Sequence, residues 1–300
     1  MKMTKLLICL LGLASLFACG PKQTETVEDI PVALQLYTVR GDMEADFLGT
    51  LCKVSEMGYD GVEFAGLFGY EPAQIKKWCD SLGLAPISAH VPLAEMLADV
   101  DKVIADYKAV GCEYIVVPYV TEERRPGGEL FLQMVEEIRA IGEKAKAAGL
   151  VLLYHNHDFE FNKLENGQTG LDYLYENVPA DLLQTELDQC WVKYAGYEPV
   201  EYLQKYSGRS PVVHLKDFYK AGEQEGDPYA LIGLNEGEKK ENKAFEFRPL
   251  GNGVQDIPAI IEAAKAAGSK WFVVEQDQPS MGKTPLECAK TSIEYLQSLK

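Results

Sequence analysis

VLLYHNHDFEF, residues 151–161, is a short apolar run that ends in two histidines, His155 and His157, separated by a single residue. The chain has four histidines, and the other two, His90 and His214, also close or follow short aliphatic runs. Groups at the carboxyl ends of buried strands line the active face of α/β barrels and open α/β sheets. Because all four histidines take this position, the sequence predicts a functional site built from the ends of strands.

Outward from this stretch, short apolar runs alternate with amphipathic segments of roughly ten to twenty residues, eight times in all from residue 32 onward. Strands that alternate with helices pair in parallel through right-handed crossovers, and about 250 residues is the usual length of eight such units closed into a barrel. We therefore predict an α/β protein, a (β/α)8 TIM barrel forming one domain over residues 32–300. An open doubly wound sheet is the alternative, but no glycine-rich phosphate turn follows the first run.

Glycine follows the last turn of five of the expected helices. A glycine there adopts the left-handed conformation that ends a helix at little cost. The same device at five corresponding places supports one repeated strand and helix unit. These glycines are Gly58, Gly83, Gly111, Gly149 and Gly268.

Composition restricts the classes of partner. A hydrophobic content of 47% and a charged content of 25% are typical of a folded globular chain, and the net charge of −17 disfavours a nucleic acid as partner. The five cysteines beyond Cys19 are scattered, without a CxxC pair, which indicates buried free thiols.

The amino terminus has the pattern of a bacterial lipoprotein signal. Residues 1–18 combine a basic start with an apolar core, and LFAC at residues 16–19 resembles a lipobox, so Cys19 would carry the lipid. A plain secretory signal is the alternative. Residues 19–31 are expected to form a polar tether, which places the protein in the bacterial cell envelope, facing the periplasm. Its membrane contact would be the lipid at Cys19 alone.

One segment breaks the repeat. Residues 219–253 lack clear periodicity and include EGEKKENK. A segment this long after the seventh strand of a barrel would lie on the active face. We therefore expect an insertion that acts as a partial lid.

The expected strand ends carry a set of metal-ligand types. Residues two apart point to the same side of a strand, so the paired groups of the fifth, sixth and seventh strands would each share one side. Carboxylates and imidazoles converging at one barrel mouth predict a site for manganese, zinc, cobalt or magnesium, with shared protons as the alternative way to relieve the like charges. The groups, in strand order, are Glu63, His90, His155 with His157, Glu186 with Asp188, His214 with Lys216, and Glu275.

Five motifs, YHNHDFEF, ELDQCWV, VVHLKDF, PLGNG and FVVEQDQP, resemble the sugar-phosphate isomerase/epimerase family of xylose-isomerase-like TIM barrels. That family includes inosose dehydratase and relatives acting on 3-keto sugars, and the resemblance runs from about residue 32 to residue 300. It implies one divalent metal held by Glu, Asp, His and Glu from strands five to eight. Asp188, His214 and Glu275 match the last three, whereas His155 occupies the place of the first glutamate.

This departure changes the expected catalytic groups. A relay between two metal-bound glutamates cannot be carried over with a histidine in one position, so we expect proton transfer by His157, Lys216 or Glu275. Lys216 has an equally weighted alternative, balancing carboxylates or holding a substrate oxygen.

Other residues are expected to contact substrate, each with an open alternative. Glu186 would bind sugar hydroxyls, ligate the metal or support a ligand, and Trp191 would stack on a sugar ring or cap the core. Glu63, His90 and Tyr119 are expected to line the pocket.

The resemblance therefore implies a divalent-metal-dependent sugar isomerase/epimerase or lyase that acts on a free or 3-keto sugar or glycoside through an enediolate-type intermediate. The partner would be a small-molecule sugar, with a homo-oligomer possible. The alternative is a non-catalytic sugar-binding lipoprotein on a degenerate barrel, motivated by the missing glutamate. An abasic-site endonuclease is disfavoured by the acidic charge and the small number of histidines.

Overall fold

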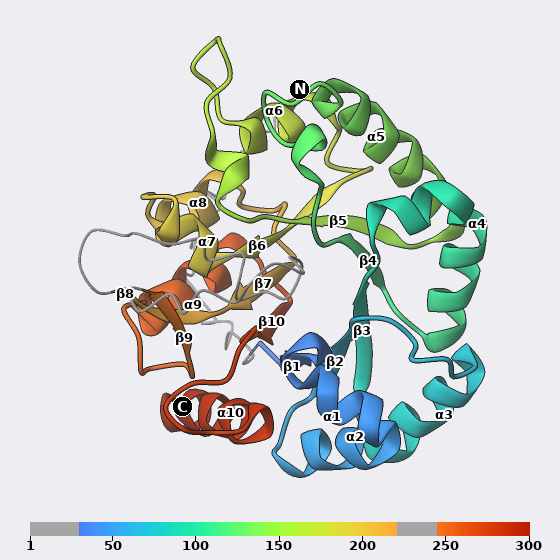
Figure 1. The fold of residues 1–300 in the computed structure, drawn as a ribbon, viewed down its shortest axis with the longest axis vertical. Helices are drawn as coiled ribbons and strands as arrows, with labels where there is room; N and C mark the ends of the chain where they lie inside the picture. Colours follow the sequence, from blue (N-terminus) through green and yellow to red (C-terminus); the bar gives the residue numbers. More distant parts are fainter. Residues whose placement is uncertain (1–29, 221–244) are drawn as a thin grey trace, which may run out of the picture.

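The computed structural model describes residues 30–220 and 245–300. Eight parallel strands close into a barrel in the order β1-β10-β7-β6-β5-β4-β3-β2, with the helices around its outside (Figure 1). The predicted TIM barrel is confirmed, and the open sheet is excluded. The barrel strands are β1 (Val32–Gln35), β2 (Gly61–Phe64), β3 (Ala85–His90), β4 (Tyr114–Val117), β5 (Val151–His155), β6 (Gln184–Asp188), β7 (Val212–Leu215) and β10 (Trp271–Val274).

The helices begin and end where local chemistry dictates. Helix α10 starts with a capping box between Thr284 and Glu287, and α9 starts with a side-chain cap from Asp256. All five predicted C-terminal glycines have positive φ, between 68° at Gly83 and 101° at Gly111. The helices are α1 (Arg40–Ala45), α2 (Phe47–Glu56), α3 (Pro72–Leu82), α4 (Leu93–Val110), α5 (Phe131–Ala148), α6 (Gly170–Asn177), α7 (Gln189–Tyr194), α8 (Pro199–Lys205), α9 (Ile257–Ala267) and α10 (Pro285–Ser298). None of the helices in the described ranges is long and apolar enough to cross a membrane.

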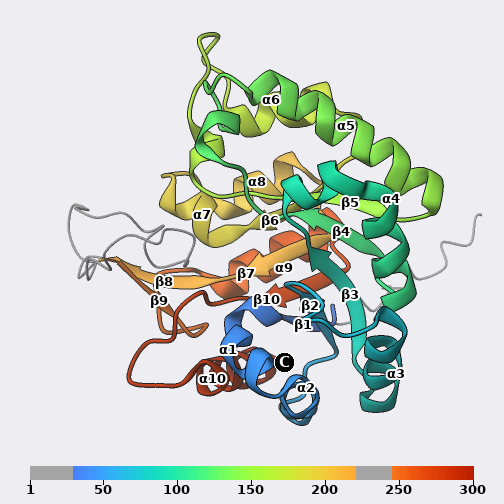
Figure 2. The same cartoon turned by 45° about the vertical axis from the view of Figure 1, so that its right-hand side comes forward.

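A two-stranded ribbon follows β7 at the active face. Strands β8 (Asp217–Lys220) and β9 (Phe245–Arg248) pair antiparallel and project from the barrel (Figure 2). The expected insertion at residues 219–253 therefore has ordered ends, while its central part, residues 221–244, lies outside the described residues. The predicted signal peptide and nearly all of the tether lie outside them too.

The barrel interior is layered. A cluster of strand residues, including Ala33, Leu153, Val212 and Val273, fills its lower part. Side chains alternate along a strand, so the residue two positions further points inward again. Those next inward positions hold Gln35, His155, His214 and Glu275. The strand pattern therefore places an apolar plug below and a polar layer at the mouth.

Candidate active site

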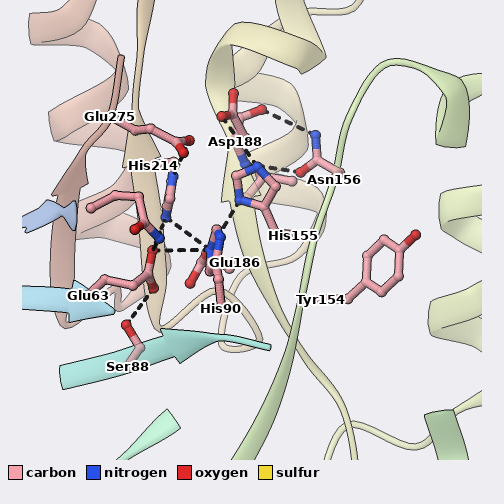
Figure 3. A network of polar contacts seen from close by, with 12 residues as sticks. Glu63, Ser88, His90, Tyr154, His155, Asn156, Glu186, Asp188, His214 and Glu275 are labelled. Atoms are coloured by element: carbon pink, nitrogen blue, oxygen red, sulfur yellow. Dashed lines mark hydrogen bonds and ion pairs between the residues drawn. The ribbon is translucent and has the colours of Figure 1, made fainter. Parts of the chain in front are cut away.

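The polar layer at the mouth draws on strands from all sides of the barrel. Figure 3 shows the imidazoles of His90, His155 and His214 meeting between carboxylates, while Tyr154 points out of the barrel from the opposite face of β5. The ring centroids of His155 and His214 are 4.6 Å apart, and those of His90 and His155 are 5.0 Å apart. The structure thus brings together residues separated by more than a hundred positions in the chain.

Two overlapping sets of side chains have metal-ligand geometry. We call His155, Asp188, His214 and Glu275 the first donor group, and His90, His155, Glu186 and His214 the second donor group. In each group the ligand atoms lie within 4.8 Å of one another. Both groups share His155 and His214. The first donor group comprises the four residues that the sequence predicts as metal ligands.

Distances within the first donor group are short. Nδ1 of His214 lies 3.1 Å from Oε2 of Glu275, and Nε2 of His155 lies 3.7 Å from Oδ2 of Asp188. Asp188 is fully buried, and its Oδ2 accepts no hydrogen bond from the part of the chain that the structure describes. A buried carboxylate oxygen without a donor is costly unless a cation satisfies it. This observation, together with two imidazoles and two carboxylates, fits a divalent metal.

Lys216 stands beside the first donor group among three carboxylates. Its Nζ lies 2.7 Å from Asp277, 3.0 Å from Glu275 and 3.8 Å from Asp188. The side chain is 1% exposed. Burial alone would lower the pKa of Lys216, but these carboxylates raise it well above its usual value, so the ammonium is charged at neutral pH. The predicted charge-balancing role of Lys216 agrees with these contacts.

Electrostatics separate the roles of the remaining groups. Burial raises the pKa of Asp188 to about 7, against the lowering effect of Lys216. Burial holds the pKa of His155 well below its usual value, and burial together with Lys216 does the same for His157. Both imidazoles are therefore neutral near pH 7, with a lone pair available for a metal or a proton.

A cavity of about 470 Å³ opens above these groups. Among the predicted site residues, its walls include His90, Tyr119, His155, His157, Lys216 and Glu275. Leu67, Phe68 and Tyr37 add apolar surface. An apolar cavity with a few convergent polar groups is typical of a small-molecule site.

Two predicted substrate contacts lie below this cavity. Glu63 and Glu186 are fully buried and do not line it. Instead, Glu63 accepts hydrogen bonds from Gln35, at 2.7 Å, and from Ser88, and lies 2.9 Å from Nε2 of His214. Glu63 and Glu186 therefore lie outside the cavity wall and contact the histidines, and the predicted alternative in which Glu186 supports a ligand agrees with this placement.

Trp191 is also placed differently from the sugar-stacking expectation. It is fully buried in an aromatic cluster with Phe218, Phe245 and Phe247 beneath the β8–β9 ribbon. Its ring lies 5.1 Å from that of His157. The core-capping alternative is therefore the one that the structure supports, because the ribbon covers the indole.

Sequence reasoning missed two polar residues of the site. Asp277 lines the cavity and pairs with Lys216, and Asn156 anchors β6: its Oδ1 accepts from the backbone N–H of Asp188 at 3.0 Å, and its Nδ2 donates to the Asp188 carbonyl at 3.2 Å. Asp277 follows the strand-end Glu275 by two residues, the same spacing that marked His157 after His155. That spacing could have indicated it.

The fold and the site define a TIM barrel with a candidate metal centre at the carboxyl ends of its strands. The model of the xylose isomerase-like TIM barrel family matches residues 51–299, and the chain belongs to this family.

Relatives and solved structures agree with this assignment. Inosose dehydratase of Geobacillus kaustophilus (strain HTA426) is 22% identical over 278 residues, which cover 83% of this chain and 86% of the relative. A sugar phosphate isomerase/epimerase structure from Parabacteroides distasonis ATCC 8503 is similar with a TM-score of 0.70 and 21% identity, over 92% of this chain and 96% of that chain. The structure of the IolI protein with a binding zinc atom has a TM-score of 0.65 and 18% identity, over 90% of this chain and 98% of that chain. At these identities the structural likeness shows the shared fold.

Proposed function

We propose that the protein is a divalent-metal-dependent sugar isomerase, epimerase or lyase. The observation that carries the proposal is the first donor group, whose four ligand atoms lie within 4.8 Å of one another beside a cavity of about 470 Å³. A divalent cation held there by His155, Asp188, His214 and Glu275 would polarise a carbonyl or hydroxyl oxygen of the substrate.

The chain's own groups would then orient the substrate and move its proton. Lys216 reaches the cavity as a charged donor, held by Glu275 and Asp277, so it can hold an oxygen that gains negative charge. His157 is neutral and stacks on Phe159 with ring centroids 5.4 Å apart, so it presents a base of fixed orientation. We assign proton transfer to His157 and charge stabilisation to Lys216.

The substrate class is proposed as a free sugar, a 3-keto sugar or a glycoside of one. The family membership and the similarity to inosose dehydratase support a polyhydroxylated ring with a carbonyl. Isomerisation, epimerisation and β-elimination all pass through an enediolate-type intermediate, in which a proton next to the carbonyl has been removed. One site of this kind can therefore serve any of the three reactions.

The test is proton exchange next to the carbonyl. The metal-loaded protein is incubated in D₂O with a panel of keto sugars and 3-keto glycosides, and deuterium uptake and elimination are followed by NMR. We expect uptake with the parent protein, and a loss of about 10²–10⁴-fold for His157→Ala. Lys193→Ala is the control, because Lys193 pairs with Glu198 on the surface.

Sugar binding without exchange or elimination, across the panel and with metal bound, would contradict the proposal. That outcome would favour a sugar-binding protein on the same barrel.

We also propose that the mature protein is anchored in the bacterial cell envelope by a lipid on Cys19, facing the periplasm. LFAC at residues 16–19 supports this. Cys19→Ser should abolish incorporation of labelled fatty acid and release the protein from the membrane fraction. If Cys19→Ser still incorporates the labelled fatty acid and stays in the membrane fraction, the anchor at Cys19 is contradicted.

A further inference from the structure

The two shared imidazoles turn different nitrogens toward the two donor groups. His155 has Nε2 3.7 Å from Asp188 but Nδ1 3.1 Å from Oε1 of Glu186. His214 has Nδ1 3.1 Å from Glu275 but Nε2 2.9 Å from the same Glu186 oxygen. Each ring therefore stands between the two groups and offers one nitrogen to each.

The second donor group is compact. Oε1 of Glu186 is approached by three imidazole nitrogens, from His90 at 2.6 Å, His214 at 2.9 Å and His155 at 3.1 Å. Ligand atoms bound tetrahedrally to zinc at about 2.0–2.1 Å lie roughly 3.3 Å apart. The three carboxylate–imidazole distances are within about 0.2–0.7 Å of this spacing, and all four ligand atoms lie within 4.8 Å of one another.

The charges of the second donor group also suit a dication. Glu186 and its neighbour Glu63 are fully buried, and Oε1 of Glu63 lies 2.9 Å from His214 and 3.1 Å from His90. Against the lowering effect of burial, Glu63 and Glu186 raise the pKa of His90 to about 10 and the pKa of His214 well above its usual value, so both imidazoles carry a proton when no metal is bound. A divalent cation that replaced these two protons would balance the same two carboxylates. Oε2 of Glu186 is buried and accepts no hydrogen bond within the described ranges, so this oxygen is left without a donor.

We propose that the second donor group is a second seat for a divalent cation of the zinc class, alternative to the seat in the first donor group. A neutral imidazole carries a single lone pair, so His155 and His214 can ligate in one group at a time. The chain then holds one ion in either of two positions, at different edges of the shared rings, one on the Nδ1 side and one on the Nε2 side.

Metal identity should select the seat. Three imidazoles with one carboxylate suit zinc and cobalt, whereas two carboxylates with two imidazoles are a harder set that suits manganese and magnesium. We therefore expect zinc and cobalt to favour the second seat, and manganese to favour the first.

The test uses matched double variants and elemental analysis. Asp188→Asn/Glu275→Gln removes both carboxylates of the first donor group and leaves the second intact. We expect about one equivalent of zinc or cobalt in both the parent and this variant, and we expect the variant to lose manganese. The converse variant, His90→Gln/Glu186→Gln, should keep about one equivalent of manganese and bind zinc at least tenfold more weakly than the parent.

Loss of all zinc and cobalt from Asp188→Asn/Glu275→Gln would overturn the second seat, and two equivalents in the parent would overturn the sharing of the imidazoles. X-ray absorption of the zinc-loaded parent provides a measurement that needs no variant to fold. Three imidazole ligands support the proposal, and two contradict it. None of these measurements depends on sugar turnover, so the proposed activity can fail while the second seat stands.

Discussion

Among single residues, His155 and Asn156 show how the chain builds its site from adjacent positions of β5. His155 points inward, and burial lowers its pKa, so its imidazole is neutral and can bind a metal. Asn156 accepts a hydrogen bond from the backbone N–H of Asp188. With a histidine and not a carboxylate at this position, the first donor group carries one negative charge fewer. The strand-end position of His155 was evident from the sequence, but the contacts of its two nitrogens with Asp188 and Glu186 were not.

Glu160 is buried beside the site and provides a test of pH dependence. It accepts hydrogen bonds from Tyr154 at 2.7 Å and from the His157 N–H at 2.8 Å, and burial raises its pKa from 4.5 to about 8. The folded state therefore keeps a proton that the unfolded state releases between these pH values. Stability should fall as the pH rises through this window, by at most about 1.4 kcal/mol per pH unit from this group.

Glu160→Gln cannot titrate and can keep both hydrogen bonds. Urea unfolding at pH 5, 6.5 and 8 should therefore show a smaller loss of stability with pH for the variant than for the parent. Parallel stability curves would show that Glu160 keeps an ordinary pKa in the folded protein.

Asn156→Ala should weaken both the fold and the first donor group. The change leaves the N–H and C=O of Asp188 without the two side-chain partners that they have now, in a fully buried position. We expect a loss of about 1–3 kcal/mol in the free energy of unfolding and weaker manganese binding. Chemical denaturation and metal titration measure both.

Asn166→Ala is the matched control, because Asn166 is exposed and bonds only to Gln168 among the hydrogen bonds described. An equal effect of the two variants would rule out an anchoring role for Asn156.

At the scale of elements, the helix-ending glycines followed from sequence because their conformation depends on the local chain. Contacts between elements could not be predicted from the sequence. Gly142, in the middle of α5, packs directly on the loop before β6: a Cβ there would lie 2.4 Å from the carbonyl oxygen of Leu182. Helix propensity alone would favour alanine at this position.

We therefore predict a reversal of the usual glycine rule in α5. Gly142→Ala should destabilise by about 1–3 kcal/mol because α5 must move away from the loop. Gly149→Ala should lower the free energy of unfolding by about 1–2 kcal/mol because of its φ of 81° alone, since an added Cβ would have no atom within 4 Å. Gly41→Ala, in open space on α1, should stabilise by about 0.5–1 kcal/mol. Thermal unfolding of the three variants checks the order, and stabilisation by Gly142→Ala would refute the packing argument.

The β8–β9 ribbon is an element that sequence periodicity did not predict. Its two strands flank residues 221–244, so no continuous pattern links them. Pairing places Phe245 and Phe247 over Trp191, with ring centroids 6.5 Å and 6.0 Å away. The ribbon, rather than the sugar, covers the indole.

For the whole molecule, the barrel gathers carboxylates that repel one another and that a bound cation would relieve. A metal at one hundred times its dissociation constant stabilises the folded state by about 2.7 kcal/mol. For a domain of this size, that corresponds to a rise in Tm of roughly 5–10 °C. Differential scanning calorimetry with and without chelator measures it.

The His155→Ala/His214→Ala variant removes the histidines common to both donor groups and is the control for this prediction. It should show no metal-dependent change in Tm. A shift of the same size in this variant would place the stabilising ion elsewhere on the molecule.

The sequence alone determined the repeated strand and helix units, the glycines that end the helices, and the inward positions of His155, Asp188, His214 and Glu275. These depend on periodicity within single segments, which each segment carries locally. Only the tertiary structure decided that Glu63 and Glu186 lie beneath the histidines, that Asp277 joins Lys216, and that Trp191 is covered. Those outcomes depend on the register of strands far apart in the chain and on barrel closure, and no local pattern encodes the height at which two distant side chains meet.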